Sequence, residues 1–173
     1  MNTLNKLDKK ELKDLLSKCW LSHDGIWFFH CTLEFGVEKA NKMNKATIKS
    51  LAPLEIKRIM KALGVEKVET FEEMREFIFE DALALVTSES VRNGFNFACP
   101  EKNVIQWEVM GQNCLSYIGT KKMGISDKYE CGVIYRIECW LESLGIKYKV
   151  TPQIESCLMH TNGQCSGYFK FDM

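Results

Sequence analysis

The hydrophobic pattern changes its period at Asn93-Gly94, and no other feature constrains the fold of this chain as strongly. Before this pair, apolar residues recur at helical spacing between capping and glycine signals. After it, short segments alternate apolar and polar side chains, as half-buried strands do. Helices followed by a mixed half are typical of α+β domains. We therefore predict an α+β fold in which a helical N-terminal half packs on a small antiparallel sheet of about four strands with further helices.

Capping signals divide the N-terminal half into helices. Asp8 is a suitable N-cap and Gly36 a suitable stop, so we expect one long helix from Asp8 to Phe35. A second helix should run from Val37 to about Ser50, and a third from Pro53 to Gly64. The capping box Thr70 to Glu73 should begin a fourth.

The C-terminal half contains the strand signals. Phe95 to Cys99 and Val104 to Val109 alternate and are joined by a short polar turn, which predicts a β-hairpin. A short helix should follow within Gly111 to Met123. A capping box from Asp127 to Glu130 indicates another helix, ending at Gly145.

A second hairpin is expected near the C-terminus, because Asn162-Gly163 is a typical hairpin turn. The strands would be Val150 to Leu158 and Cys165 to Phe171. Cys157 would then lie roughly opposite Cys165, at a separation that a disulfide or a shared metal ion allows.

The segment from Cys157 to Cys165 holds two thiols and the imidazole of His160 within nine residues. These three side chains are candidate ligands for zinc or iron, although structural zinc needs a fourth ligand from elsewhere in the chain. The two thiols could instead form a redox pair, or Cys157 and His160 could act as nucleophile and base. Free cysteines also serve simply as compact core residues, and the sequence leaves these alternatives open.

The long N-terminal helix carries a stripe at helical spacing, formed by Leu12, Leu16, Cys19, His23, Ile26 and His30. The two histidines lie about 20° apart in the middle of this stripe, so we expect them to face the interior. With Asp24 and Trp27 they would line a pocket: His23, Asp24, Trp27 and His30 form the candidate wall. The alternative is that each histidine is a core residue held by a backbone carbonyl.

Cys139 lies opposite the aliphatic stripe of the last predicted helix. It is therefore exposed, or the helix has a second buried face. The neighbouring Arg136 would favour the thiolate, which makes Cys139 a third candidate catalytic residue beside Cys157 and His160. A lone cysteine is more often inert.

Composition narrows the class of protein. Lys plus Arg and Asp plus Glu number 23 each, and no basic stripe is present, so we expect no nucleic-acid partner. No apolar run approaches the roughly 18 residues of a membrane span, and Met1 to Leu16 lacks a signal region. We expect a single domain over residues 1–173, located in the cytoplasm, where the eight cysteines stay free, bind metal or react. The charged, leucine-containing N-terminus leaves a homodimer open.

Three segments carry a resemblance to a family of uncharacterised cytosolic proteins of bacteria and archaea. They are Cys19 to Trp27, Asn41 to Lys61, and the region from Trp140 through the Cys157-His160 segment to Cys165. More distantly, the C-terminal cysteine pattern is similar to the L-2-amino-thiazoline-4-carboxylic acid hydrolase-like family and to vinyl-4-reductase domains. The hydrolase resemblance implies a thiol among Cys139, Cys157 and Cys165 that attacks a small cyclic substrate, with His160 or His23 as base.

The sequence therefore favours a cytosolic protein that binds a small molecule in a pocket lined by cysteine and histidine. A thiol-dependent hydrolase of small cyclic or amide-like substrates is the enzymatic form of this hypothesis. The alternative is a non-enzymatic protein that binds metal or senses redox state through Cys157, His160 and Cys165.

Overall fold

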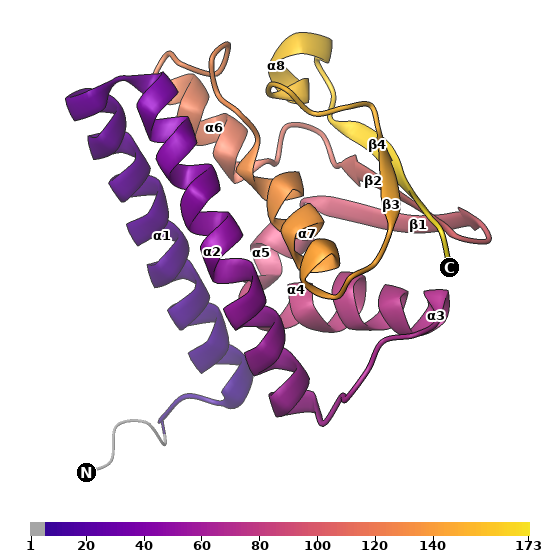
Figure 1. The fold of residues 1–173 in the computed structure, drawn as a ribbon. Coiled ribbons are helices and arrows are strands. Elements are labelled where there is room, and N and C mark those ends of the chain that lie inside the picture. The colour runs from indigo at the N-terminus through magenta and orange to yellow at the C-terminus, as the bar shows by residue number, and fades with distance from the viewer. Residues whose placement is uncertain (1–5) are drawn as a thin grey trace.

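Two long helices form a hairpin along one side of the molecule, as Figure 1 shows for this computed structural model, which describes residues 6–173. Helix α1 spans Lys9–Phe35 and helix α2 spans Val37–Leu63, joined only by Gly36. Gly36 has a φ of 79°, which a side chain would disfavour, so glycine permits this sharp reversal. The first five residues of the predicted Met1 to Leu16 segment lie outside the described residues.

The start of α1 is confirmed as predicted. Asp8 accepts a hydrogen bond from Glu11 N, and the Glu11 side chain accepts one from Asp8 N, which completes a capping box. The predicted break before Pro53 is wrong, because α2 continues through it. A proline removes one backbone donor, and the neighbours Ala52 and Ile56 are buried, so tertiary packing holds the helix together across this loss.

The predicted capping box at Thr70 and Glu73 is also present, and it begins a composite helix. This helix comprises α3 (Phe71–Met74), a π-helical segment η2 (Arg75–Ala82) and α4 (Leu83–Val86). A short helix α5 (Glu89–Arg92) leads into the sheet. No helix within residues 6–173 has both the length and the apolar character that crossing a bilayer requires.

The sheet has four antiparallel strands in the order β1-β2-β4-β3, which confirms the predicted α+β fold. The strands are β1 (Phe95–Glu101), β2 (Val104–Val109), β3 (Tyr148–Thr151) and β4 (Ser166–Phe171). In β2, Ile105 and Trp107 are buried whereas Gln106 and Glu108 are exposed. One face of the sheet therefore meets the core and the other meets solvent.

Helix α7 (Gly132–Ser143) lies between the α1/α2 hairpin and the sheet (Figure 1). It follows α6 (Leu115–Lys122), and it begins two residues after the predicted capping box. The side chain of Asn41 explains the difference, because it donates to Lys128 O at 2.7 Å and accepts from Glu130 N at 3.3 Å. These bonds to α2 hold the box residues outside the helix.

The predicted C-terminal hairpin is wrong in its connection. Strands β3 and β4 do pair, with Thr151 opposite Tyr168, but Asn162-Gly163 ends a short helix, α8 (Leu158–Asn162), instead of turning a hairpin. Gly163 has a φ of 72°, the left-handed geometry of a helix stop as well as of a turn. Cys157 precedes this helix and Cys165 precedes β4, so the two are not ladder partners.

Candidate functional site

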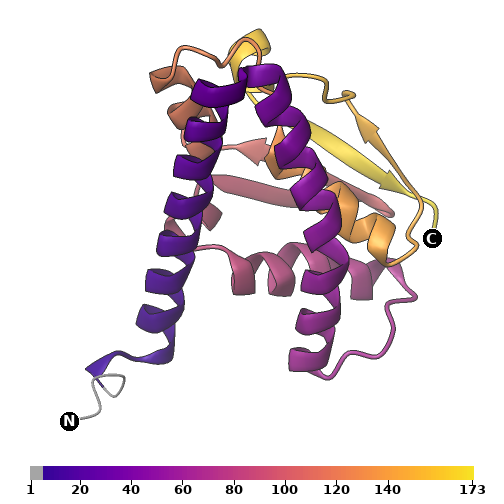
Figure 2. The same cartoon turned by 60° about the vertical axis from the view of Figure 1, so that its left-hand side comes forward.

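An apolar cavity of about 410 Å³ lies among α1, α2, α7, the η2–α5 region and strand β1. Its volume falls within the range of roughly 300 to 1,000 Å³ that is typical of small-molecule sites. The view in Figure 2 shows the hairpin of α1 and α2 standing away from the sheet, with α7 behind it. Segments that are distant in sequence thus contribute to one cavity.

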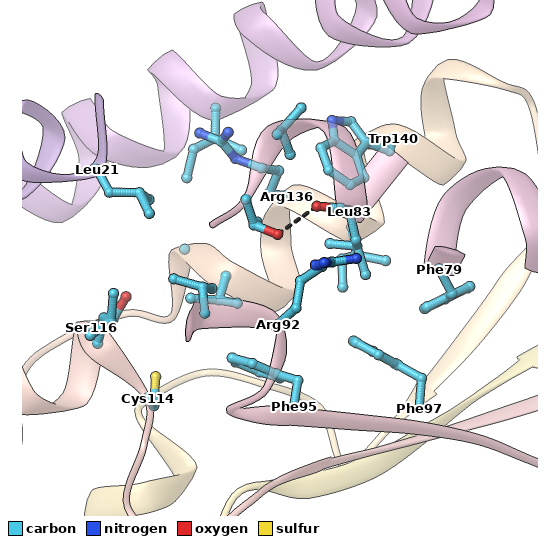
Figure 3. A pocket seen from close by; sticks show the side chains of 18 of the residues that line it. Leu21, Phe79, Leu83, Arg92, Phe95, Phe97, Cys114, Ser116, Arg136 and Trp140 are labelled. Atoms are coloured by element: carbon cyan, nitrogen blue, oxygen red, sulfur yellow. Dashed lines mark hydrogen bonds between the residues drawn. The ribbon is translucent and has the colours of Figure 1, made fainter. Parts of the chain in front are cut away.

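Aromatic side chains form much of the wall. Phe95 and Phe97 project from β1 with nearly parallel rings, 6.2 Å between centroids, and Phe79 of η2 approaches Phe97 at 5.2 Å (Figure 3). Trp140 of α7 and Leu21 of α1 lie on the other sides. Such a wall offers favourable contacts to an apolar or ring-containing ligand.

Three arginines reach this cavity, and they differ in their partners. Arg75 forms an ion pair with Glu80, and Arg136 forms one with Glu55 at 3.0 Å while it stacks over the Trp20 ring at 4.7 Å. Arg92 makes no ion pair with any carboxylate of residues 6–173. Figure 3 shows its guanidinium above Phe95 and Phe97, inside the ring of lining side chains.

Two cysteines line the cavity, Cys99 of β1 and Cys114, the N-cap residue of α6. Burial raises the pKa of Cys114, and the backbone N–H groups of Tyr117 and Ser116 lower it by a smaller amount. The net direction is upward, so this thiol stays protonated at neutral pH. None of the three histidines lines the cavity.

The predicted wall of His23, Asp24, Trp27 and His30 is mostly wrong. His23, Trp27 and His30 have exposed side chains, with Trp27 60% exposed, so their stripe does not face the interior. Asp24 alone lines the cavity. The stripe was assigned to the wrong side because α1 is apolar on two sides, and spacing cannot say which one meets the core.

Cys139 is buried, which resolves the predicted choice in favour of a second buried face on α7. It does not line the cavity, and Arg136 is engaged with Glu55. Burial raises the pKa of Cys139, and a hydrogen bond with Tyr135 lowers it by a smaller amount. The surroundings of Cys139 therefore favour the protonated thiol and not the predicted thiolate.

Cys157 and Cys165 are buried, but His160 is exposed and its Nδ1 lies 3.1 Å from Ser126 Oγ. No hydrogen bond joins a thiol to an imidazole within the described part of the chain. Within those same residues, no three His, Cys, Asp or Glu side chains are placed to hold a metal ion. The predicted trio of Cys157, His160 and Cys165 is thus not assembled as a ligand set.

Four cysteines lie in one region, close enough for electrostatic interaction between their thiols: Cys114, Cys131, Cys157 and Cys165. Burial raises the pKa of Cys131 to about 12 and that of Cys165 to about 11. The Trp107 indole lowers the pKa of Cys165, although its Nε1 has no partner in normal hydrogen-bond geometry within residues 6–173. We regard this contact as a close approach and not as a formed hydrogen bond.

Sequence reasoning missed Arg92, Phe79, Phe95 and Phe97 as cavity residues. Phe95 and Phe97 share one face of a correctly predicted strand, which was the available signal. Arg92 precedes Phe95 by three residues, but the sequence does not show that its side chain reaches the same cavity, because this depends on how α5 joins β1.

Comparison with known proteins identifies the family of the chain but no activity. Residues 3–157 match the model of a protein family that is described as a family of unknown function. No curated protein and no solved structure matches the chain. The function must therefore be argued from the cavity itself.

Proposed function

The chain belongs to this family of unknown function (DUF6125), and from that premise we propose that it is a binding protein for a small apolar molecule that carries one acidic group. The observation that carries the proposal is the apolar cavity of about 410 Å³ with Arg92 on its wall. The aromatic wall would bury the body of the ligand. The guanidinium of Arg92 would bind its anionic end.

The apolar part of the proposal is supported by the lining. Phe79, Phe95 and Phe97 form a continuous set of ring contacts, and Ile137 and Trp140 of α7 are buried beside them. A ligand in contact with these rings would remove its own apolar surface from water, which is worth about 25 cal/mol per Å². The cavity is thus suited to an aromatic or alicyclic body.

The acidic part is supported by the difference among the three arginines. Arg75 and Arg136 already have carboxylate partners, so a ligand would have to compete for them. Arg92 has no such partner among residues 6–173 and can form a charge-assisted hydrogen bond with a carboxylate. Because Arg92 is exposed, this bond should contribute only about 1 kcal/mol.

Binding is better supported than thiol-dependent hydrolysis. A catalytic thiol needs a base within hydrogen-bond reach, and neither cavity cysteine, Cys99 or Cys114, has a histidine beside it in the lining. The pKa of Cys114 is raised, which opposes thiolate formation. The metal-binding or redox-sensing alternative at Cys157 and Cys165 remains a separate hypothesis.

The proposal is tested by calorimetric titration with two probes of equal shape, 2-naphthoate and 2-naphthol, at neutral pH. We expect 2-naphthoate to bind more tightly, and Arg92→Gln to weaken it roughly fivefold while leaving 2-naphthol nearly unchanged. Val133→Trp should abolish binding of both probes, because Val133 lines the cavity. Val37→Trp is the matched control, a half-buried valine outside the cavity.

Failure of both probes to bind would contradict the proposal, as would binding that Val133→Trp leaves intact. If Arg92→Gln weakened binding of the two probes equally, the proposed ligand would not need an acidic group. Native mass spectrometry of the purified protein supplies an independent readout. A mass excess equal to one metal ion that survives Val133→Trp would favour the metal-binding alternative.

A further inference from the structure

Helix α1 carries a second apolar surface that faces away from the rest of the chain. Figure 1 shows α1 at the edge of the molecule, with no other element on its outer side. Its inner side, which includes Ser17, Leu21 and Phe28, packs toward α2 and the cavity. A stripe about 150° around the helix from this side is exposed and largely apolar.

The exposed stripe follows the spacing of a coiled-coil seam. Its members are separated alternately by three and four residues: Leu16, Cys19, His23, Ile26, His30 and Leu33. This repeat keeps one face of a helix against a neighbouring helix over its whole length. The sequence pattern that suggested a core face is thus real, but within the described residues no other element covers it.

The exposed area of the stripe approaches that of a protein–protein interface. Leu16, Ile26 and Leu33, with Leu15 and Trp27 on the flanks, are each between 50% and 67% exposed. Together these five side chains leave on the order of 600 Å² uncovered, close to the roughly 800 Å² that each partner contributes to a standard interface. Isolated soluble proteins rarely leave a contiguous apolar patch of this size in water.

We propose that α1 pairs through this stripe with α1 of a second copy of the chain, in an antiparallel arrangement about a two-fold axis. A two-fold interface requires a surface that complements itself. Antiparallel pairing centred between Asp24 and Gly25 does this, because it sets Leu16 against the second copy's Leu33 and His23 against its Ile26. Parallel pairing would instead set His23 against His23 and His30 against His30, two polar contacts within the seam.

The spacing of the stripe also favours a second helix over a lipid surface as its binding partner. Helices that lie on membranes have a broad apolar face bordered by Lys and Arg. The α1 stripe contains two histidines and a cysteine, and its flanks include Leu15, Ser22 and Trp27 in place of basic residues. A narrow seam with a strict repeat is the pattern of helix pairing.

Light scattering after size-exclusion chromatography tests the pairing. We expect the mass of two chains at about 50 µM, and a Leu16→Glu/Ile26→Glu variant to raise the dissociation constant by roughly 100-fold or more, since each carboxylate enters the seam twice. Both side chains are exposed, so the variant should keep its circular dichroism spectrum and its affinity for 2-naphthoate. Leu85→Glu, at an exposed leucine on α4, is the control and should remain dimeric.

Cross-linking tests the orientation. In a Cys19→Ser/Cys99→Ser background, which removes the exposed thiols, Leu16→Cys with Leu33→Cys should give covalent dimers on treatment with copper phenanthroline. Leu16→Cys alone should not, because antiparallel pairing separates the two copies of position 16. A monomeric wild-type protein, a dimer that survives Leu16→Glu/Ile26→Glu, or efficient cross-linking through Leu16→Cys alone would overturn the proposal. A monomer that binds anionic lipid vesicles would instead assign the stripe to a membrane.

Discussion

The indole Nε1 of Trp140 donates a hydrogen bond to Oε2 of Glu55 at 2.8 Å, from the C-terminal part of α7 to the C-terminal part of α2. The other carboxylate oxygen accepts from Arg136 Nη1 at 3.0 Å. Glu55 is almost fully buried, and Trp140 is completely so. A single carboxylate thus satisfies two donors and joins the helical hairpin to the central helix beside the cavity.

Removing this carboxylate should strongly destabilise the fold. Glu55→Ala leaves a partly buried guanidinium and a buried indole N–H without acceptors, and we expect the free energy of unfolding to fall by about 3 kcal/mol. Glu55→Gln keeps an acceptor for Trp140, so the loss should be smaller, about 1 to 2 kcal/mol. Urea unfolding measures both, with Glu66→Ala at an exposed loop position as control. Equal losses for the two variants would show that the indole contact contributes nothing.

Gly167 should not tolerate a side chain. A Cβ there would lie 2.4 Å from ring carbons of Trp107 and 2.5 Å from Thr151 O, and neither the buried ring nor the strand backbone can move away easily. We expect Gly167→Ala to cost about 2 kcal/mol or more. Gly119→Ala, inside α6 with nothing within 4 Å, should instead stabilise the protein slightly. Thermal unfolding of both variants gives the comparison, and a neutral Gly167→Ala would contradict the packing.

Stability should decline as pH rises above about 9. Burial raises the pKa of Cys131 to about 12 and that of Cys165 to about 11, so the folded chain keeps protons that the unfolded thiols release. Each such thiol should lower the free energy of unfolding by about 1.4 kcal/mol per pH unit between the unfolded and the folded pKa. The stability that they contribute is complete below the unfolded pKa.

Urea titrations from pH 8 to about 10.5 measure this slope. Cys131→Ala should reduce the slope, whatever its effect on stability at pH 8. Gly119→Ala, which changes no titratable group, should leave the slope unchanged. If Cys131→Ala leaves the slope as it is in the wild type, the thiol does not titrate as its burial predicts.

Asn41 should matter both for stability and for the cavity. Its amide bonds hold Lys128 and Glu130 beside Tyr129, a residue of the cavity wall. Asn41→Ala should cost about 2 kcal/mol, because the buried Asn41 side chain is lost and two partly buried backbone groups lose their partner. It should also weaken binding of 2-naphthoate. Asn96→Ala, at an exposed position on β1, is the control, and a normal affinity in Asn41→Ala would separate this contact from the site.

Local signals were reliable where the interaction that they describe is itself local. The capping boxes at Asp8 and Thr70 use a backbone N–H and a side chain three residues apart, and both form. The box predicted at Asp127 does not start a helix, because Asn41, far away in sequence, accepts from Glu130 N, one of the groups that the box would use, and donates to Lys128 O. The Asn162-Gly163 signal is ambiguous by itself, because a glycine in the left-handed conformation both turns hairpins and ends helices.

The candidate site was less predictable than the fold. Spacing identified a real stripe on α1, with His23 and His30 at its centre, but not the side of the helix that the core would take. The cavity depends on Arg92, Phe95 and Phe97 meeting residues of α1 and α7, which are contacts between distant segments. Cys157 was predicted near the end of a strand, but it is the N-cap of α8, and the His160 imidazole contacts Ser126 instead of a thiol.

The sequence by itself determined the α+β class, the limits of α1, the β1–β2 hairpin and the apolar repeat along α1. Each of these follows from residues within a few turns or one hairpin of one another, so propensity, capping and periodicity are sufficient. Only the tertiary structure decided which side of α1 is buried, which cavity arginine has no carboxylate partner among residues 6–173 and which thiols lie close together. These properties depend on burial and on contacts across the chain, and the free energy of such contacts is not encoded in any single segment.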